Sequence, residues 1–214
     1  MTEIPAEAFS KIIEELVKRP LQINEYRKKV GDGRSQAFGL VHRRSAPVDF
    51  SRLCWKRTYL YSLLLEFAAE YVKIPWTSIT LNQDYKAGPH FDKHNTGPSF
   101  LVAFGDFTGG ELRIHTAGEK QGVHDVRHKP LVMDFTTNLH SVEDYVGHRY
   151  SLVFYQIQKV PADVPAGSVK KEGNKYFFYR GEEKITDGLP HALKGRKKGP
   201  KGLQIGGPVL LTFD

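Results

Sequence analysis

Residues 140–158 read HSVEDYVGHRYSLVFYQIQ, and from Arg149 onward two kinds of side chain alternate. Alternate residues of an extended strand project from opposite faces, so the segment predicts a β-strand over 149–158 with one apolar, aromatic face. The apolar face holds Tyr150, Leu152 and Phe154, and the other holds Arg149, Ser151, Val153 and Tyr155. We therefore expect one face of this strand to pack on the hydrophobic core and the other to direct Arg149 into the protein.

More strands are predicted before this segment. From Ile79 onward, short runs rich in Val, Ile, Phe and Tyr are separated by Gly, Pro and Asn, which is typical of an antiparallel sandwich or barrel. These predicted strands span 78–83, 99–105, 111–115 and 130–135. A turn and a further short strand are expected within GDGRSQAFGLVHRR at 31–44. The pattern therefore favours a mainly β fold.

Two amphipathic helices are expected to flank the strands. The first spans 6–18 and is stopped by Pro20, and the second spans roughly 56–72 and is followed by Pro75. Apolar residues recur at three- and four-residue steps in both, so each should bury one face against a sheet. The apolar positions of the first helix are Phe9, Ile12, Ile13, Leu16 and Val17.

The length of 214 residues suits one domain with an appendage, which we place at 1–160 and 161–214. The appendage combines a linker at 161–168, a hairpin at 175–185 and a basic, glycine-rich loop at 193–202. That loop is equally consistent with a solvated surface segment. The formal net charge of +7 inclines the protein toward polyanionic partners without identifying one.

Composition excludes several classes of protein. Hydrophobic residues make up 40% and charged residues 26%, as in ordinary globular proteins, and no apolar run reaches the ~20 residues that a membrane helix needs. Cys54 is the single cysteine, which excludes an internal disulfide and a cysteine-based zinc site. With no secretory signal in view, we expect an intracellular protein of the cytoplasm or nucleus, a viral origin staying open, and we expect a monomer without membrane contact.

GPHFDKHN at 88–95 carries the strongest chemical signal. His90 and Asp92 are two residues apart and would share one face of an extended strand. His140 follows 48 residues after Asp92, just before a turn, and a neighbouring strand could bring it to the same metal. Two imidazoles and one carboxylate form the facial triad of non-haem Fe(II) oxygenases. His128 is the main competitor for the third position, and an H-x-D pair alone is common.

Arg149 strengthens this interpretation, because a buried guanidinium needs an anion. Its planar fork matches a carboxylate, and the distal carboxylate of 2-oxoglutarate would supply one, with Ser151 as a second donor. The sequence thus predicts Fe(II) as the metal and 2-oxoglutarate and O2 as co-substrates.

Four motifs resemble the 2-oxoglutarate and Fe(II)-dependent dioxygenases, in particular the branch of the ten-eleven-translocation enzymes and the J-binding-protein thymine hydroxylases. They are GRSQAFG at 33–39, PHFDKHN at 89–95, FGDFTGGEL at 104–112 and HSVEDYVGHRYSL at 140–152. The resemblance covers about Gly31 to Gln158 and implies a double-stranded β-helix, or cupin-like jelly roll, with helices on one sheet. It makes His90, Asp92 and His140 the iron ligands and Arg149 the 2-oxoglutarate anchor.

The same resemblance gives softer roles to four other residues. Asn95 falls where a polar residue faces the target base, although a turn cap explains it equally well. Tyr155 falls near an aromatic that stacks on the flipped base. Arg34 and Gln36 lie in an early polar loop that reaches the co-substrate and the base, so we assign Arg34 to the co-substrate and Gln36 to the base.

Three functions follow from these residues. The first is a TET-like oxygenase that hydroxylates the methyl group of 5-methylcytosine or thymine in nucleic acid, with DNA favoured over RNA, after flipping the base. Phosphates would then meet basic residues such as Arg52, Lys56, Arg57 and the 194–201 cluster. The second is a protein (prolyl-type) hydroxylase, against which Arg149 speaks because those enzymes usually anchor the keto acid with lysine. The third is a nucleic-acid-binding module without catalysis.

Overall fold

The computed structural model describes residues 2–23, 31–43, 46–116 and 122–186. Its largest element is a six-stranded sheet of order β2-β1-β3-β9-β4-β7 in which neighbouring strands run antiparallel. The strands are β1 (Gly31–Arg43), β2 (Ala46–Phe50), β3 (Ser78–Ala87), β4 (Asn95–Gly109), β7 (Leu131–Met133) and β9 (Tyr145–Ile157). The predicted strand at 149–158 therefore lies in the middle of the sheet.

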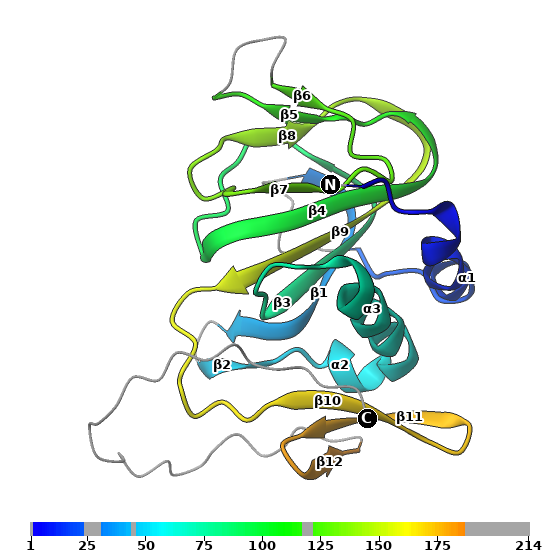
Figure 1. Cartoon of the computed structure of the whole chain (residues 1–214), viewed down its shortest axis with the longest axis vertical. Helices are drawn as coiled ribbons and strands as arrows, with labels where there is room; N and C mark the ends of the chain where they lie inside the picture. The colour runs from blue at the N-terminus through cyan, green and yellow to red at the C-terminus, as the bar shows by residue number, and fades with distance from the viewer. Residues whose placement is uncertain (1, 24–30, 44–45, 117–121, 187–214) are drawn as a thin grey trace.

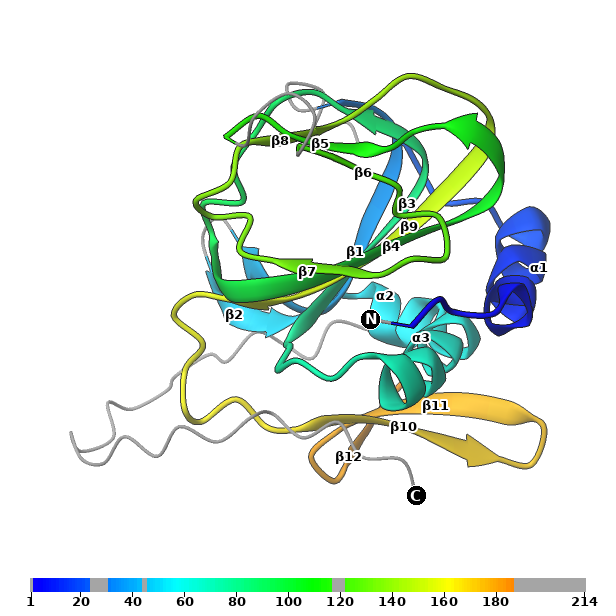
Figure 2. The same ribbon diagram turned by 45° about the horizontal axis from the view of Figure 1, so that its top comes forward.

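A small second sheet faces the large one. It has the order β6-β5-β8 and consists of β5 (Leu112–Ile114), β6 (Val123–His124) and β8 (His140–Val142). Figure 2 shows the two sheets curving toward each other around a common interior. This arrangement is the mainly β, jelly-roll architecture that the sequence predicted.

Helices cover the outer face of the large sheet (Figure 1). They are the 3₁₀ turn η1 (Ala6–Phe9), α1 (Ser10–Lys18), α2 (Leu53–Lys56) and α3 (Thr58–Tyr71). Phe9 stacks on Phe104 of β4 with ring centroids 4.4 Å apart, and Phe67 of α3 stacks on Phe154 of β9 at 6.0 Å. Each fully buried aromatic or aliphatic side chain of this layer contributes roughly 1.5–3 kcal/mol. The helices therefore fix the sheet from one side and leave its other face to the site.

A third sheet packs beyond α2 and α3 and has the order β10-β11-β12. It comprises β10 (Gly167–Glu172), β11 (Lys175–Arg180) and β12 (Glu183–Ile185). The predicted hairpin at 175–185 is confirmed, and its Phe178 packs edge-on against Phe50 of β2 at 5.1 Å. The basic loop predicted at 193–202 lies outside the described residues.

Four sequence predictions need correction. Val17, expected on the apolar face of the first helix, is 67% exposed. His90 and Asp92 do not belong to a strand: β3 ends at Ala87, and His90 makes only an isolated bridge. Arg57, expected at phosphates, is buried and donates to the carbonyl of Arg19. The second predicted helix is broken at Arg57 into α2 and α3.

The sequence did not predict strands β2, β6, β8 and β10. Strands β6 and β8 span only two and three residues, and β10 is mostly polar, so these three show no alternation of apolar and polar residues.

No helix within the described residues is both long and apolar enough to cross a lipid bilayer.

Candidate active site

His90, Asp92 and His140 converge inside the barrel, and their ligand atoms all lie within 4.8 Å of one another. His90 and His140 exchange two backbone hydrogen bonds of 3.0 and 3.1 Å, which hold the loop after β3 against the start of β8. Asp92 is fixed separately, because its backbone N–H donates to the carbonyl of Phe135 at 2.9 Å. The sequence predicted that His90 and Asp92 share one face of a strand. They are instead brought together by the backbone bridge to His140 and by the hydrogen bond to Phe135.

The tautomers of the two histidines follow from their partners. His90 Nδ1 lies 2.8 Å from the carbonyl of Gly88, and His140 Nδ1 lies 3.0 Å from the carbonyl of Asn138. A carbonyl only accepts, so both Nδ1 atoms carry the proton and both Nε2 atoms present a lone pair. Carbonyl partners of this kind orient metal-binding imidazoles in proteins.

Burial and the neighbouring His90 lower the pKa of His140, which keeps its imidazole neutral near pH 7. Phe135 packs over His140 with ring centroids 4.5 Å apart. Asp92 stands beside these imidazoles, with its Oδ1 3.6 Å from His90 Nε2. Neutral imidazoles and an ionised carboxylate are the forms that bind a divalent metal, and the remaining coordination positions would face the pocket. The donor set therefore fits Fe(II).

Asn95 belongs to the same group. It is 8% exposed, and its Nδ2 donates to Asp92 Oδ2 at 3.3 Å, while its carbonyl accepts from Gln158 Nε2 at 2.7 Å. Asn95 also closes the turn after Asp92, because its backbone N–H donates to the Asp92 carbonyl at 3.0 Å, so it caps this turn and its side-chain amide orients the carboxylate.

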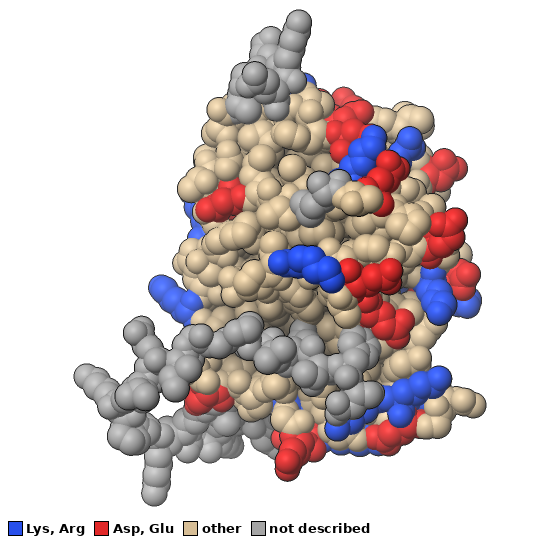
Figure 3. All heavy atoms as spheres, viewed as in Figure 1, with Lys and Arg blue, Asp and Glu red and all other residues tan. Residues whose placement is uncertain are grey.

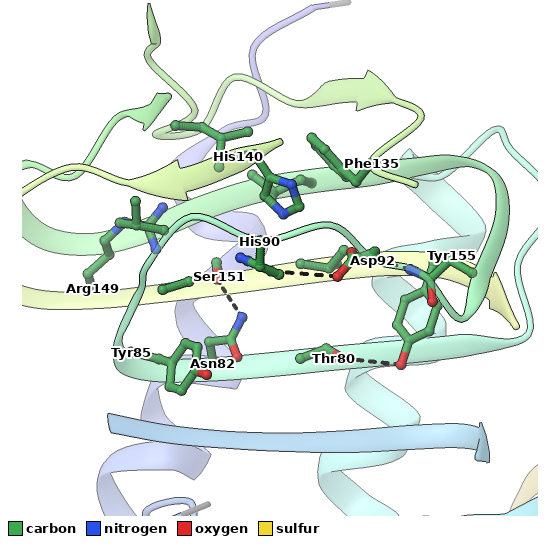
Figure 4. Close-up of a pocket in the computed structure, with 16 residues that line it drawn as sticks. Thr80, Asn82, Tyr85, His90, Asp92, Phe135, His140, Arg149, Ser151 and Tyr155 are labelled. Carbon is green, nitrogen blue, oxygen red and sulfur yellow. Dashed lines mark hydrogen bonds and ion pairs between the residues drawn. The ribbon is translucent and has the colours of Figure 1, made fainter. Parts of the chain in front are cut away.

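Arg149 lies in the same pocket as the triad (Figure 4). It is 2% exposed, and its Nε donates to the carbonyl of Gly110 at 3.1 Å. Its Nη2 is buried and has no hydrogen-bond partner among the described residues. Burial lowers the pKa of Arg149 to about 10, so the guanidinium stays charged at pH 7. A buried cation with a free donor fits the distal carboxylate of a dicarboxylic acid.

Gly110 makes room for this arginine. Its φ of +73° is in the left-handed region, and a Cβ at this position would lie 2.9 Å from Arg149 Cδ. The Gly109-Gly110 pair, expected only as a turn between strands, therefore also leaves the space that the Arg149 side chain occupies.

The pocket face of β9 is as predicted, with Arg149, Ser151, Val153 and Tyr155 all lining the cavity. Ser151 Oγ accepts from Asn82 Nδ2 at 3.0 Å, and Thr80 Oγ1 donates to Tyr155 Oη at 3.2 Å. Figure 4 shows Arg149 at one end of the row and Tyr155 at the other, with the three candidate ligands between them.

Arg34 and Gln36 do not line this pocket. Arg34 Nη1 donates to the carbonyl of Leu21 at 2.6 Å. The neighbouring positions Ser35 and Ala37 line a second cavity, so on this part of β1 the odd-numbered side chains face inward and Gln36 faces away. The resemblance placed Arg34 and Gln36 in a loop, whereas both lie in strand β1, and neither lines the pocket to which it was assigned.

Sequence reasoning missed Asn82 and Tyr85 of β3, which also line the pocket. A bulge separates them: Gly33 has φ +119°, and a Cβ there would lie 2.1 Å from the carbonyl oxygen of Asp84. The irregularity moves the inward face from Thr80 and Asn82 to Tyr85 and Ala87. Strict alternation cannot find residues beyond such a bulge, although Gly33 is a signal for one.

No family model matches the chain, and no curated protein matches it. Solved structures are similar at low identity. NgTET1 in complex with 5mC DNA has a TM-score of 0.49 and 16% identity over 72% of this chain and 69% of that one. A Burkholderia pseudomallei oxidoreductase of the 2OG-Fe(II) oxygenase family has a TM-score of 0.44 and 18% identity, over 67% and 74%. A Pseudomonas putida prolyl-4-hydroxylase has 0.44 and 15%, over 73% and 89%. Identities below 20% and TM-scores below 0.5 do not establish a shared reaction.

Proposed function

We propose that this protein is an Fe(II)- and 2-oxoglutarate-dependent dioxygenase that hydroxylates the methyl group of a pyrimidine base, 5-methylcytosine or thymine, in nucleic acid. The observation that carries the proposal is one pocket holding both the His90, Asp92 and His140 group and the buried, partly unpaired guanidinium of Arg149. The Arg149 Nε donates to the carbonyl of Gly110 and its guanidinium lies over the rings of Phe107 and Tyr145, yet these contacts leave Nη2 without a hydrogen-bond partner among the described residues.

Each side chain has a part in this reaction. His90, Asp92 and His140 would hold the iron, and Arg149, aided by the Ser151 hydroxyl, would hold the far carboxylate of 2-oxoglutarate. Bound Fe(II) supplies the activation of O2 with which the keto acid is converted to succinate and CO2 while the substrate gains a hydroxyl group. The apolar walls formed by Leu101, Leu112 and Phe135 exclude water. Asn95 keeps the Asp92 carboxylate in position.

Charge gives only modest support to the nucleic-acid substrate. On the face shown in Figure 3, most charged side chains lie toward the edges, where lysine and arginine are mixed with acidic residues. No basic patch stands out on this face, so we expect a base to be recognised by its ring and edge, with stacking on Tyr155 offsetting part of the few kcal/mol that base flipping costs.

The test is incubation with iron, 2-oxoglutarate and matched oligonucleotides that contain cytosine, 5-methylcytosine or thymine, followed by nucleoside mass spectrometry. We expect hydroxymethylated base with a methylated pyrimidine only, together with more succinate than the small amount that forms without a second substrate. Prolyl peptides run in parallel test the protein-hydroxylase alternative. If a peptide is hydroxylated and no base is oxidised, the same catalytic site acts on protein and the nucleic-acid substrate is wrong. If no succinate forms with any substrate, the proposal that the protein is a dioxygenase is wrong.

A further inference from the structure

A second cavity of about 310 Å³ adjoins the candidate active site at the end away from Arg149. Thr80, Asn95 and Tyr155 line both cavities, so these three side chains form the boundary between them. In Figure 4 the candidate metal ligands lie between Arg149 and this boundary. A co-substrate held by Arg149 would therefore leave the outer cavity as the approach to the metal for a second molecule.

The outer cavity carries an unusual combination of groups. Among the described residues that line it, none is Lys, Arg, Asp or Glu, whereas hydroxyl, amide and imidazole groups are frequent. His42 of β1 and His94 of the loop after Asp92 approach each other there, with ring centroids 6.2 Å apart and planes at 58°. Leu40, Val41 and Ile157 complete the lining with apolar surface.

These groups select against charged guests. A cationic or anionic group entering the cavity would meet no lysine, arginine, aspartate or glutamate among the described residues that line it. An uncharged ring would instead place its flat faces against apolar and aromatic side chains, while its polar edge meets hydroxyl, amide and imidazole groups, of which the imidazoles of His42 and His94 are exposed to solvent. A proline ring could use the apolar walls but has no edge for the two imidazoles.

We propose that the outer cavity receives the reacting group of the substrate as a flat, uncharged heterocycle, and that His42 and His94 are specificity-determining residues that hydrogen-bond its edge. The inference rests on the proposed function, in which the heterocycle is the flipped methylpyrimidine, and it adds where that base lies and which side chains distinguish it. The ring would lie in the outer cavity against the boundary formed by Thr80, Asn95 and Tyr155, with its methyl group pointing toward the metal.

A steric block tests the location. Ala37 lines the outer cavity and not the inner one, so Ala37→Phe should fill the first and leave the second intact. We expect this variant to form succinate from 2-oxoglutarate without a second substrate at the wild-type rate, and to bind and oxidise a 5-methylcytosine oligonucleotide at least tenfold less well. Ala69→Phe on the exposed side of α3 is the matched control and should behave as wild type. Normal oxidation by Ala37→Phe would overturn the location.

A deletion tests the specificity. His42→Ala should raise the KM for the oligonucleotide by roughly five- to tenfold, the loss expected for one hydrogen bond, with kcat little changed. His42→Gln keeps a donor and an acceptor and should restore part of the affinity. His124→Ala, at a half-buried histidine outside both cavities, serves as the control. An unchanged KM in His42→Ala, or an equal rise in the control, would contradict the assignment.

A binding measurement separates this inference from the proposed function. Metal-free protein with isotopically labelled histidine is titrated with 5-methyl-2′-deoxycytidine or with a capped proline amide, and the imidazole signals are followed by NMR. We expect the His42 and His94 signals to move with the nucleoside only. If succinate is formed but no pyrimidine is oxidised, the substrate in the proposed function fails, and the titration still decides the cavity: shifts with the nucleoside retain it, and no shift or shifts with the proline amide overturn it.

Discussion

The two faces of β9 differ in how their side chains are satisfied, and only the core face is buried from Tyr150 to Phe154, since Val153 and Tyr155 on the pocket face are half-buried. On the core face, Leu152 and Phe154 are 0% exposed and belong to the apolar cluster that this sheet forms with the helices. On the pocket face, Arg149 and Ser151 are 2% and 3% exposed, yet Arg149 Nη2 and the nearby Asn82 Oδ1 have no hydrogen-bond partner among the described residues.

This difference separates stability from chemistry along one strand. An unpaired buried polar group costs about 1–3 kcal/mol of folding free energy, and more if it is charged. The pocket face therefore destabilises the ligand-free protein, and a ligand that pairs these groups would remove that cost. The core face supplies the stability that offsets this cost. Substitutions on the core face should therefore lower the free energy of unfolding, whereas substitutions on the pocket face should lower activity with little loss of stability.

The largest effect is expected at the metal. His140→Ala should remove one of the three ligands and lower 2-oxoglutarate turnover by at least about 10³-fold, equivalent to roughly 4 kcal/mol. Iron binding, measured by equilibrium dialysis, should weaken in parallel. His128→Ala is the control, because the His128 ring lies against Phe9 with centroids 5.3 Å apart and is not part of the metal-binding group. Loss of iron in His128→Ala and not in His140→Ala would reverse the ligand assignment.

The core face should give the largest loss of stability. Phe154 packs against Phe67, Trp76 and Phe100 with ring centroids 5.4 to 6.0 Å away. Phe154→Ala should therefore lower the free energy of unfolding, measured in urea, by about 3–5 kcal/mol. Tyr155→Phe, one residue further and on the pocket face, should lower it by less than about 1 kcal/mol while changing substrate oxidation. Similar stability losses for the two variants would remove the contrast.

Arg149 should combine a loss of function with no loss of stability. Arg149→Met replaces a buried, partly unpaired cation by an apolar side chain of similar length, a change that is often neutral or stabilising. The variant should bind 2-oxoglutarate about 10- to 100-fold more weakly, because a charge-assisted hydrogen bond contributes roughly 1.5–3 kcal/mol. In thermal unfolding, added 2-oxoglutarate with metal should raise the Tm of the wild type and not that of the variant. A Tm increase in both would place the keto acid elsewhere.

The elements around β9 show what a sequence can reveal. Alternation in 149–158 predicted the strand and the direction of Arg149, and the H-x-D pair with His140 predicted three side chains that do converge. Periodicity works there because each residue is regularly placed relative to its neighbours.

The remainder depends on irregular backbone. His90 and Asp92 are brought together by a bridge to His140 and a hydrogen bond to Phe135, and Tyr85 is turned inward by a bulge opposite Gly33. Arg34 and Gln36 were assigned to a loop, although they lie on β1, whose inward positions have the other parity. Such features arise from long-range contacts and leave little trace in a local pattern.

The smallest effect is expected at Ser151, where the contrast is most finely tested. Its Oγ accepts from Asn82 Nδ2, so the hydroxyl proton is available for a bound carboxylate. Ser151→Ala should weaken 2-oxoglutarate binding about two- to tenfold, the range for one neutral hydrogen bond. If the hydroxyl only supports Asn82, the substitution should instead lower the unfolding free energy of the empty protein without changing affinity. A double-mutant cycle with Asn82→Ala, measured for both affinity and stability, distinguishes the two roles, because a ligand contact leaves an affinity loss that persists when Asn82 is absent.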